Sequence, residues 1–299
     1  MKQNVQITEK FNQHLAKIFS RKIIMDLARN GESGYLNEIL LNSGFVKFLG
    51  SDFKLIDIFD AVYKYLSKTY RNEYIYKNVI ANKILLGRHS LNTSFMMTEF
   101  RVGSCKADVA IFNGTSNVYE IKTELDSLER LANQIAEYQK FFDKVQIITA
   151  PNQTNKISKS VGPSIGILEL TPRNTIKTIQ QAKSGKKRVS PETIFDSLRK
   201  SEYLSIIGKH YGPIPKVPNT QIYKECRAIF SKISPELAHD SMVTLLKQRG
   251  NSHGLKNFIE SVPYSLKAIA LNSCLKEKEA ISFINKLNSS YPYLYSNAA

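Results

Sequence analysis

Apolar and polar residues alternate in the central part of the chain, and this alternation predicts β-strands. Strands are expected over residues 97–102, 107–112, 118–123 and 145–149. The dipeptide Asn113-Gly114 separates two of these segments and is the strongest short-range signal of a β-hairpin. The first three strands are therefore expected to form an antiparallel meander.

Apolar residues at spacings of three and four predict helices on both sides of the meander. One helix is expected over 74–86, ahead of the strands, and another over 125–142, between the third and fourth strands. Pro151 is expected to stop the fourth strand. The predicted order is helix, three-strand meander, helix and strand, which places the chain in the α/β class.

Helical periodicity also fills the regions that flank this α/β segment. Apolar stripes up to residue 69 predict helices that pack on the central segment. Beyond a Pro-rich passage, further helices are expected over 222–233, 237–248, 255–261, 266–274 and 276–287. The chain therefore divides into an N-terminal helical segment 1–69, a core 70–172 and a basic helical C-terminal domain 173–299.

Two carboxylates and an amine fall on the central hairpin. Because alternate residues of a strand share a face, Glu120 and Lys122 point the same way. With the turn centred on Gly114, Asp108 lies directly across from Glu120, at a Cβ separation of roughly 4.5–5.5 Å. Two anions this close repel each other unless a cation neutralises them. Oxygen ligands of this kind favour a hard divalent ion.

The pattern Asp followed by Glu-x-Lys is short, and it arises by chance in roughly a third of chains of this length. Its context strengthens it here, because Glu120-Ile121-Lys122 is the sole Glu-x-Lys in the sequence and lies on a strand whose other face is apolar. The alternative interpretation is a solvent-exposed hairpin face that carries ordinary charges.

These residues and this order of elements resemble the core of the PD-(D/E)xK nuclease superfamily, which has the restriction-endonuclease-like fold. Within it, the chain is most similar to a group of uncharacterised bacterial proteins that share its Asp-Val-Ala and Tyr-Glu-Ile-Lys strands. The resemblance covers about a third of the 299 residues. Ala107 stands where most members of the superfamily have a proline before the aspartate.

The resemblance implies a metal-dependent nuclease. Asp108 and Glu120 would be metal ligands, with the backbone carbonyl of Ile121 and the carboxylate of Glu73 as further ligands. Lys122 would orient the attacking water and offset the negative charge of the transition state. The implied cofactor is Mg²⁺ or Mn²⁺.

Gln134 and Tyr138 lie at i and i+4 of the predicted helix, hence on one face. They resemble the Gln-x-x-x-Tyr pair of RecB-like and lambda-exonuclease-like members, which implies that they support the site and contact substrate. The alternative is structural, because Tyr138 continues the apolar stripe and Gln134 is a helix-surface amide.

The position of Glu73 has a structural alternative too, because acidic residues are favoured at helix N-termini. For Glu99 and Arg101 the pattern favours a structural role.

The charge of the chain agrees with a nucleic-acid partner. The sequence has 42 Lys and Arg residues against 26 Asp and Glu residues, a net charge of +16, which favours polyanions through counterion release. From residue 171 onward, 20 basic residues face 9 acidic ones. Residues 183–190, which include Lys186-Lys187-Arg188, are expected to be a mobile linker or a phosphate-contacting loop.

Several other classes of function find no support in the sequence. Three widely spaced cysteines, Cys105, Cys226 and Cys274, argue against a disulfide framework or a zinc site. The sequence has no Gly-rich phosphate-binding loop and no run of eighteen apolar residues. Because its first residues are polar and charged, we expect no signal peptide. We therefore expect a cytoplasmic protein that does not enter the membrane.

The leading hypothesis is a metal-dependent nuclease that cuts DNA, in a setting such as defence against foreign DNA. Two alternatives stay open. One is a non-catalytic nucleic-acid-binding or protein-interaction module with a nuclease-like fold, and the other is an RNase. A protein partner or a homo-oligomer is compatible with each of these hypotheses.

Overall fold

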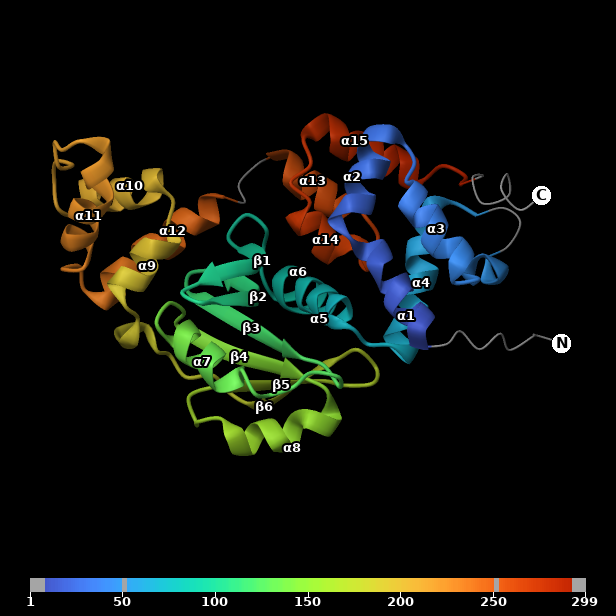
Figure 1. The fold of residues 1–299 in the computed structure, drawn as a ribbon, viewed down its shortest axis with the longest axis horizontal. Coiled ribbons are helices and arrows are strands. Elements are labelled where there is room, and N and C mark those ends of the chain that lie inside the picture. The colour runs from blue at the N-terminus through green and yellow to red at the C-terminus, as the bar shows by residue number, and fades with distance from the viewer. Residues whose placement is uncertain (1–8, 50–52, 250–252, 292–299) are drawn as a thin grey trace. The chain divides into compact units, whose positions relative to one another are not determined.

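The computed structural model describes residues 9–49, 53–249 and 253–291 (Figure 1). Its contacts divide the chain into two compact units. Unit 1 comprises residues 1–84 and 252–299, and unit 2 comprises residues 85–251. This division differs from the three consecutive segments expected from the sequence, because the last helices of the chain belong with the first ones.

Unit 1 is helical over the residues that the structure describes. Its main helices are α1 (Glu9–Ala16), α2 (Arg21–Asn30), α3 (Gly34–Asn42), α4 (Leu55–Thr69), α5 (Glu73–Val79), α13 (His253–Ser261), α14 (Lys267–Asn272) and α15 (Glu277–Leu287). Hydrogen bonds join its N- and C-terminal parts: Arg29 Nε donates to Glu279 Oε1 at 2.8 Å, and Asn78 Nδ2 donates to the Tyr264 carbonyl at 2.8 Å. A π-helical stretch, Ile80–Leu85, follows α5.

Unit 2 contains a six-stranded sheet in the order β1-β2-β3-β4-β5-β6, as Figure 1 shows. The strands are β1 (Phe95–Val102), β2 (Cys105–Phe112), β3 (Ser116–Lys122), β4 (Lys144–Thr149), β5 (Gly166–Leu170) and β6 (Ile176–Gln180). β1, β2 and β3 form an antiparallel meander, β3, β4 and β5 are parallel, and β6 is antiparallel to β5. The α/β class and the four predicted strands are confirmed.

The helices of unit 2 are α6 (Leu86–Arg88), α7 (Leu131–Gln139), α8 (Pro151–Ser160), α9 (Pro191–Ser197), α10 (Lys200–His210), α11 (Asn219–Phe230) and α12 (Pro235–Gln248). All of them except α6, which buries none of its residues, contribute side chains to one apolar core shared with the sheet. Leu131 of α7 and Ile157 of α8 are buried with Val118 and Ile147 of the sheet. Phe195, in α9, belongs to the same cluster. The helices that follow β6 are therefore part of the sheet unit as far as residue 251.

The helix expected over 125–142 was wrong at its start. Residues 123–130 form a loop, because the Asp126 carboxylate accepts hydrogen bonds from the Thr123 amide at 2.8 Å and the Thr123 hydroxyl at 2.7 Å. This arrangement competes with a helical turn. Leu125, which continues the apolar spacing, is 72% exposed. Helix α8, which has Pro151 in its first turn, was not among the expected elements.

Within the described ranges, none of the helices combines the length and the apolar character that a membrane span requires.

Candidate functional site

The register of β2 and β3 confirms the predicted hairpin. Val109 pairs with Tyr119, so Asp108 stands across from Glu120, just beyond the last paired residues. At this point the Ile121 amide donates a 2.7 Å hydrogen bond to Oδ2 of Asp108. If the β-ladder continued, this amide would donate to a backbone carbonyl of the neighbouring strand. Here the Asp108 carboxylate replaces that carbonyl.

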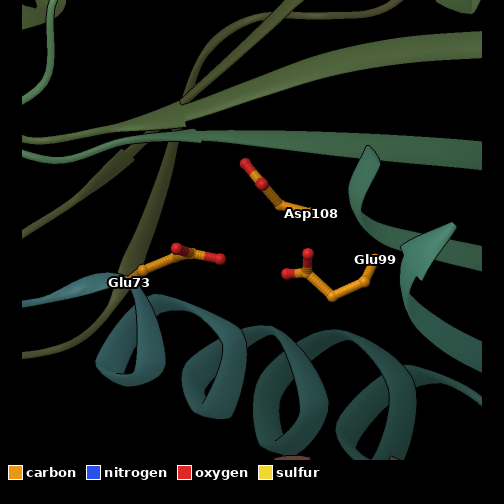
Figure 2. A group of neighbouring side chains, drawn as sticks. All are labelled: Glu73, Glu99 and Asp108. Atoms are coloured by element: carbon orange, nitrogen blue, oxygen red, sulfur yellow. The ribbon is translucent and has the colours of Figure 1, made fainter. Parts of the chain in front are cut away.

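A second carboxylate reaches Asp108 from β1. Phe100 pairs with Ala107, which places Glu99 opposite Asp108 on the other side of β2. Glu99 has a φ of 57°, a conformation that costs free energy for a residue other than glycine. One carboxylate oxygen of Glu99 lies within 4.8 Å of one of Asp108 (Figure 2). Glu99 is also paired with an exposed cation, since its Oε2 lies 2.6 Å from Lys106 Nζ.

Glu120 and Lys122 form a buried ion pair on β3. Lys122 Nζ lies 2.9 Å from Glu120 Oε1, and the side chains of Lys122 and Glu120 are 6% and 3% exposed. Charges removed from water to this degree are stable only with close and complete partners. The strand end that carries them is fixed from β4, where the Thr149 hydroxyl donates to the Lys122 carbonyl at 2.9 Å.

Helix α7 supplies the other partners of this ion pair. Lys122 Nζ donates to Gln134 Oε1 at 3.0 Å, and the Tyr138 hydroxyl donates to Glu120 Oε2 at 2.8 Å. The Tyr138 hydroxyl also lies 3.0 Å from the Lys106 carbonyl. Gln134 and Tyr138 therefore contact the Glu-x-Lys residues from one face of α7, as their i and i+4 spacing predicts.

Burial and the neighbouring Glu120 carboxylate raise the pKa of Tyr138 well above its usual value. The phenol stays protonated across the physiological range and acts as a hydrogen-bond donor to Glu120. A neutral donor suits this position, because a second anion beside Glu120 would repel it.

The structure therefore brings together five of the residues singled out from the sequence: Asp108, Glu120, Lys122, Gln134 and Tyr138. Ile121 is also at the site, through its amide, and its carbonyl as a ligand stays a prediction. Glu73, the third side chain drawn in Figure 2, belongs to unit 1. It opens α5 and forms an ion pair with Lys77 at 2.5 Å. Its role as a metal ligand stays a prediction.

The donors at this site suit a hard divalent cation, because carboxylate oxygens are the ligands that Mg²⁺ and Mn²⁺ prefer. In unit 2, a carboxylate oxygen of Asp108 and one of Glu99 lie within 4.8 Å of each other. Both oxygens of Glu120 have protein partners, Lys122 and Tyr138. The predicted ligand pair of Asp108 and Glu120 thus requires Glu120 to exchange one of these partners for the ion.

Glu99 is the site residue that the sequence interpretation set aside as structural. A signal for it was present, because the turn at Gly103 fixes the β1–β2 register as Gly114 fixes the β2–β3 register. Gly103 has a φ of 54°, which suits the left-handed region that glycine tolerates. Applied to both hairpins, the same register argument places Glu99 and Glu120 on either side of Asp108.

A Tyr138→Phe substitution tests the hydrogen bond from α7. We expect the free energy of unfolding to fall by about 2 kcal/mol, because a buried carboxylate loses a donor. Urea unfolding followed by circular dichroism measures the change. Tyr211→Phe is the matched control, since Tyr211 is 44% exposed, and a loss of similar size in both variants would contradict the assignment.

Comparison with known proteins places this site in a phage family. The family model described as bacteriophage P4 protein cII matches residues 66–272, from the end of α4 to the end of α14. Protein cII of Enterobacteria phage P4 is 28% identical over 172 residues, which are 56% of this chain and 63% of that protein. The chain thus spans less than two thirds of the length of this relative.

A solved structure, the SPO1766 protein of unknown function from Silicibacter pomeroyi, matches 40% of this chain and 81% of its own, with 12% identity and a TM-score of 0.28. The family match covers more than half of the chain and includes every residue of the site described above. The chain therefore belongs to the bacteriophage P4 protein cII family.

Proposed function

We propose that this protein is a metal-dependent nuclease that hydrolyses phosphodiester bonds in nucleic acid, with DNA as the preferred substrate. The observation that carries the proposal is the buried Lys122 ammonium beside Glu120, at the strand end where Asp108 also lies. The order of elements supports it: a helical stretch, the β1–β3 meander, α7 and the parallel strand β4 follow the order of a restriction-endonuclease-like core.

In this proposal Asp108 and Glu99 hold Mg²⁺ or Mn²⁺, with Glu120 as the ligand that the resemblance adds. The ion would lower the pKa of the attacking water and neutralise charge on the scissile phosphate. The amide of Ile121 fixes the orientation of Asp108 through its 2.7 Å hydrogen bond. Fixed carboxylates of this kind hold a ligand geometry better than mobile surface side chains do.

In this proposal Lys122 contacts a substrate oxygen. Two of its three N–H donors are directed to Glu120 and Gln134, which leaves one for a phosphate oxygen. Set between a carboxylate and an amide oxygen, the ammonium would stabilise the negative charge that develops on the phosphate. We assign Lys122 this electrostatic role in preference to that of a general base.

One observation favours a second candidate, a nucleic-acid-binding module without catalysis. Glu120 is buried and its two oxygens are already bonded to Lys122 and Tyr138, as in a structural ion pair. The phage relative favours a phage-related setting for either candidate. A role in defence against foreign DNA stays a prediction.

The decisive experiment measures cleavage of labelled duplex DNA, single-stranded DNA and RNA, each with Mg²⁺, Mn²⁺ or EDTA. We expect metal-dependent cleavage by the wild-type protein and a loss of at least about a hundredfold in Asp108→Asn, which removes a charged ligand. Glu124→Gln, which alters an exposed carboxylate in the loop after β3, is the matched control. Binding without cleavage would favour the module, and cleavage of RNA alone would identify an RNase.

A further inference from the structure

Residues 183–188, which we term the basic loop, connect β6 to α9 and are held in place by Asp143. Oδ1 of Asp143 accepts hydrogen bonds from the Ser184 hydroxyl, from the Gly185 amide at 3.1 Å and from the Lys186 amide at 3.0 Å. The Gly185 amide also donates to the Asp143 carbonyl at 2.7 Å. A single buried aspartate thus fixes three consecutive residues of the loop.

Further contacts fix the C-terminal end of the basic loop and the residues that follow it. The Arg188 amide donates to the Gly185 carbonyl at 2.8 Å, and the Ser190 amide donates to the Lys140 carbonyl at 2.7 Å. Burial alone would raise the pKa of Asp143, but hydrogen bonds from the Ser184 and Thr115 hydroxyls lower it overall. The carboxylate therefore stays ionised near neutral pH. The sequence leaves two interpretations open for this segment, a mobile linker and a phosphate-contacting loop. These contacts favour the phosphate-contacting loop.

Three cations of the basic loop face solvent. Lys183, Lys187 and Arg188 are exposed, and no ion pair within the described part of unit 2 includes them. Lys186 differs, because its ammonium lies 2.5 Å from Asp240. Cations without carboxylate partners on an ordered backbone form a favourable surface for a polyanion, since little conformational freedom is lost on binding.

The basic loop lies at the far end of the helix that contacts the candidate site. α7 carries Gln134 and Tyr138 beside Lys122, and the residue after α7, Lys140, accepts the hydrogen bond from Ser190. At a rise of 1.5 Å per residue, Gln134 and Lys140 are roughly 9 Å apart along the axis. This distance corresponds to about three base steps of a nucleic-acid strand.

The geometry points to the basic loop as a phosphate-backbone contact for the nucleic acid that unit 2 acts on. The choice of partner rests on the proposed function. Lys183, Lys187 and Arg188 bind phosphates a few nucleotides from Lys122, and Asp143 keeps their backbone in place. Contacts of this type position the strand without reading its sequence.

The test compares two double variants that remove the same charge. Lys187→Gln/Arg188→Gln alters the basic loop, and Arg173→Gln/Lys177→Gln alters exposed cations at and beside β6. Fluorescence anisotropy with labelled duplex DNA and duplex RNA, in EDTA and over a salt series, gives the affinity and its salt dependence. We expect the loop variant to bind at least about tenfold more weakly than the wild type. The slope of the logarithm of its binding constant against the logarithm of the salt concentration should be smaller in magnitude by about two, whereas the β6 variant keeps the wild-type slope.

Loop-dependent binding to either polymer supports the inference, because phosphates are common to DNA and RNA. Equal effects of the two double variants would overturn it, and so would a wild-type protein that binds neither polymer at low salt. Thermal unfolding checks that both variants fold, since substitutions at exposed positions have little effect on stability. Because EDTA prevents metal-dependent cleavage, loop-dependent binding by a protein that never cleaves would refute the nuclease proposal alone.

Discussion

A Lys122→Met variant is expected to lose nucleic-acid cleavage by about 10²–10³-fold. The substitution keeps the aliphatic stem but removes the ammonium that lies 2.9 Å from Glu120 and 3.0 Å from Gln134. It also leaves Glu120 as an unpaired buried charge, which we expect to lower the free energy of unfolding by about 3 kcal/mol. Single-turnover cleavage with Mg²⁺ and urea unfolding measure the two effects.

The double variant Glu120→Gln/Lys122→Met separates catalysis from stability. A neutral glutamine side chain on β3 needs no cation beside it, and its amide oxygen still accepts the hydrogen bond from Tyr138. We expect the double variant to recover most of the lost stability, as proteins often do when a buried ion pair is replaced as a whole. It should stay inactive. Recovered cleavage in the double variant, or full activity in Lys122→Met, would contradict the electrostatic role proposed for Lys122.

The part of the site that was predictable from sequence depends on local turn chemistry. Asn113-Gly114 closes a hairpin whose register follows from the turn, so the positions of Asp108 and Glu120 could be worked out without a structure. The i and i+4 spacing of Gln134 and Tyr138 likewise fixes a shared face on α7. That these two residues bond Lys122 and Glu120 depends on how α7 packs on the sheet, which no local rule supplies.

Features set by side-chain competition or by distant contacts were not predictable in the same way. The Asp126 carboxylate accepts a hydrogen bond from the Thr123 amide, and α7 therefore begins later in the chain than expected. The apolar spacing alone predicts an earlier start, because it includes Leu125. The helices after residue 173 show clear periodicity, and α11 to α15 lie close to their expected ranges. Periodicity identifies the buried face of a helix but not the core that receives it. The assignment of α9–α12 to one unit and α13–α15 to the other therefore came only from the structure.

An Asp143→Ala variant is expected to lower the free energy of unfolding by about 3–4 kcal/mol. Asp143 is 6% exposed, and its carboxylate accepts hydrogen bonds from Thr115, Ser184, Gly185 and Lys186. Removing the carboxylate leaves Thr115, Ser184 and Lys186 without this acceptor, whereas the Gly185 amide keeps the Asp143 backbone carbonyl. Urea unfolding followed by circular dichroism measures the loss.

Asp196→Ala is the matched control for this substitution. Asp196 pairs with Arg227 at 2.9 Å, but both side chains are more than 40% exposed, so we expect a loss below about 1 kcal/mol. Similar losses in the two variants would show that the buried hydrogen bonds of Asp143 contribute nothing beyond an ordinary surface pair.

The pH dependence of the Asp143 effect follows from the lowered pKa of this carboxyl. Its stabilisation is fully present above the usual pKa of an aspartate and is lost as the pH falls through the lower folded-state value. The difference in unfolding free energy between wild type and Asp143→Ala should therefore narrow in acid and stay constant near neutral pH. A gap that widens as the pH falls would show that the carboxyl works in its protonated form. The same carboxylate holds the basic loop, so Asp143→Ala should also weaken nucleic-acid binding under conditions where the variant is still folded. The dependence of that affinity on salt concentration then distinguishes a displaced loop from a general loss of structure.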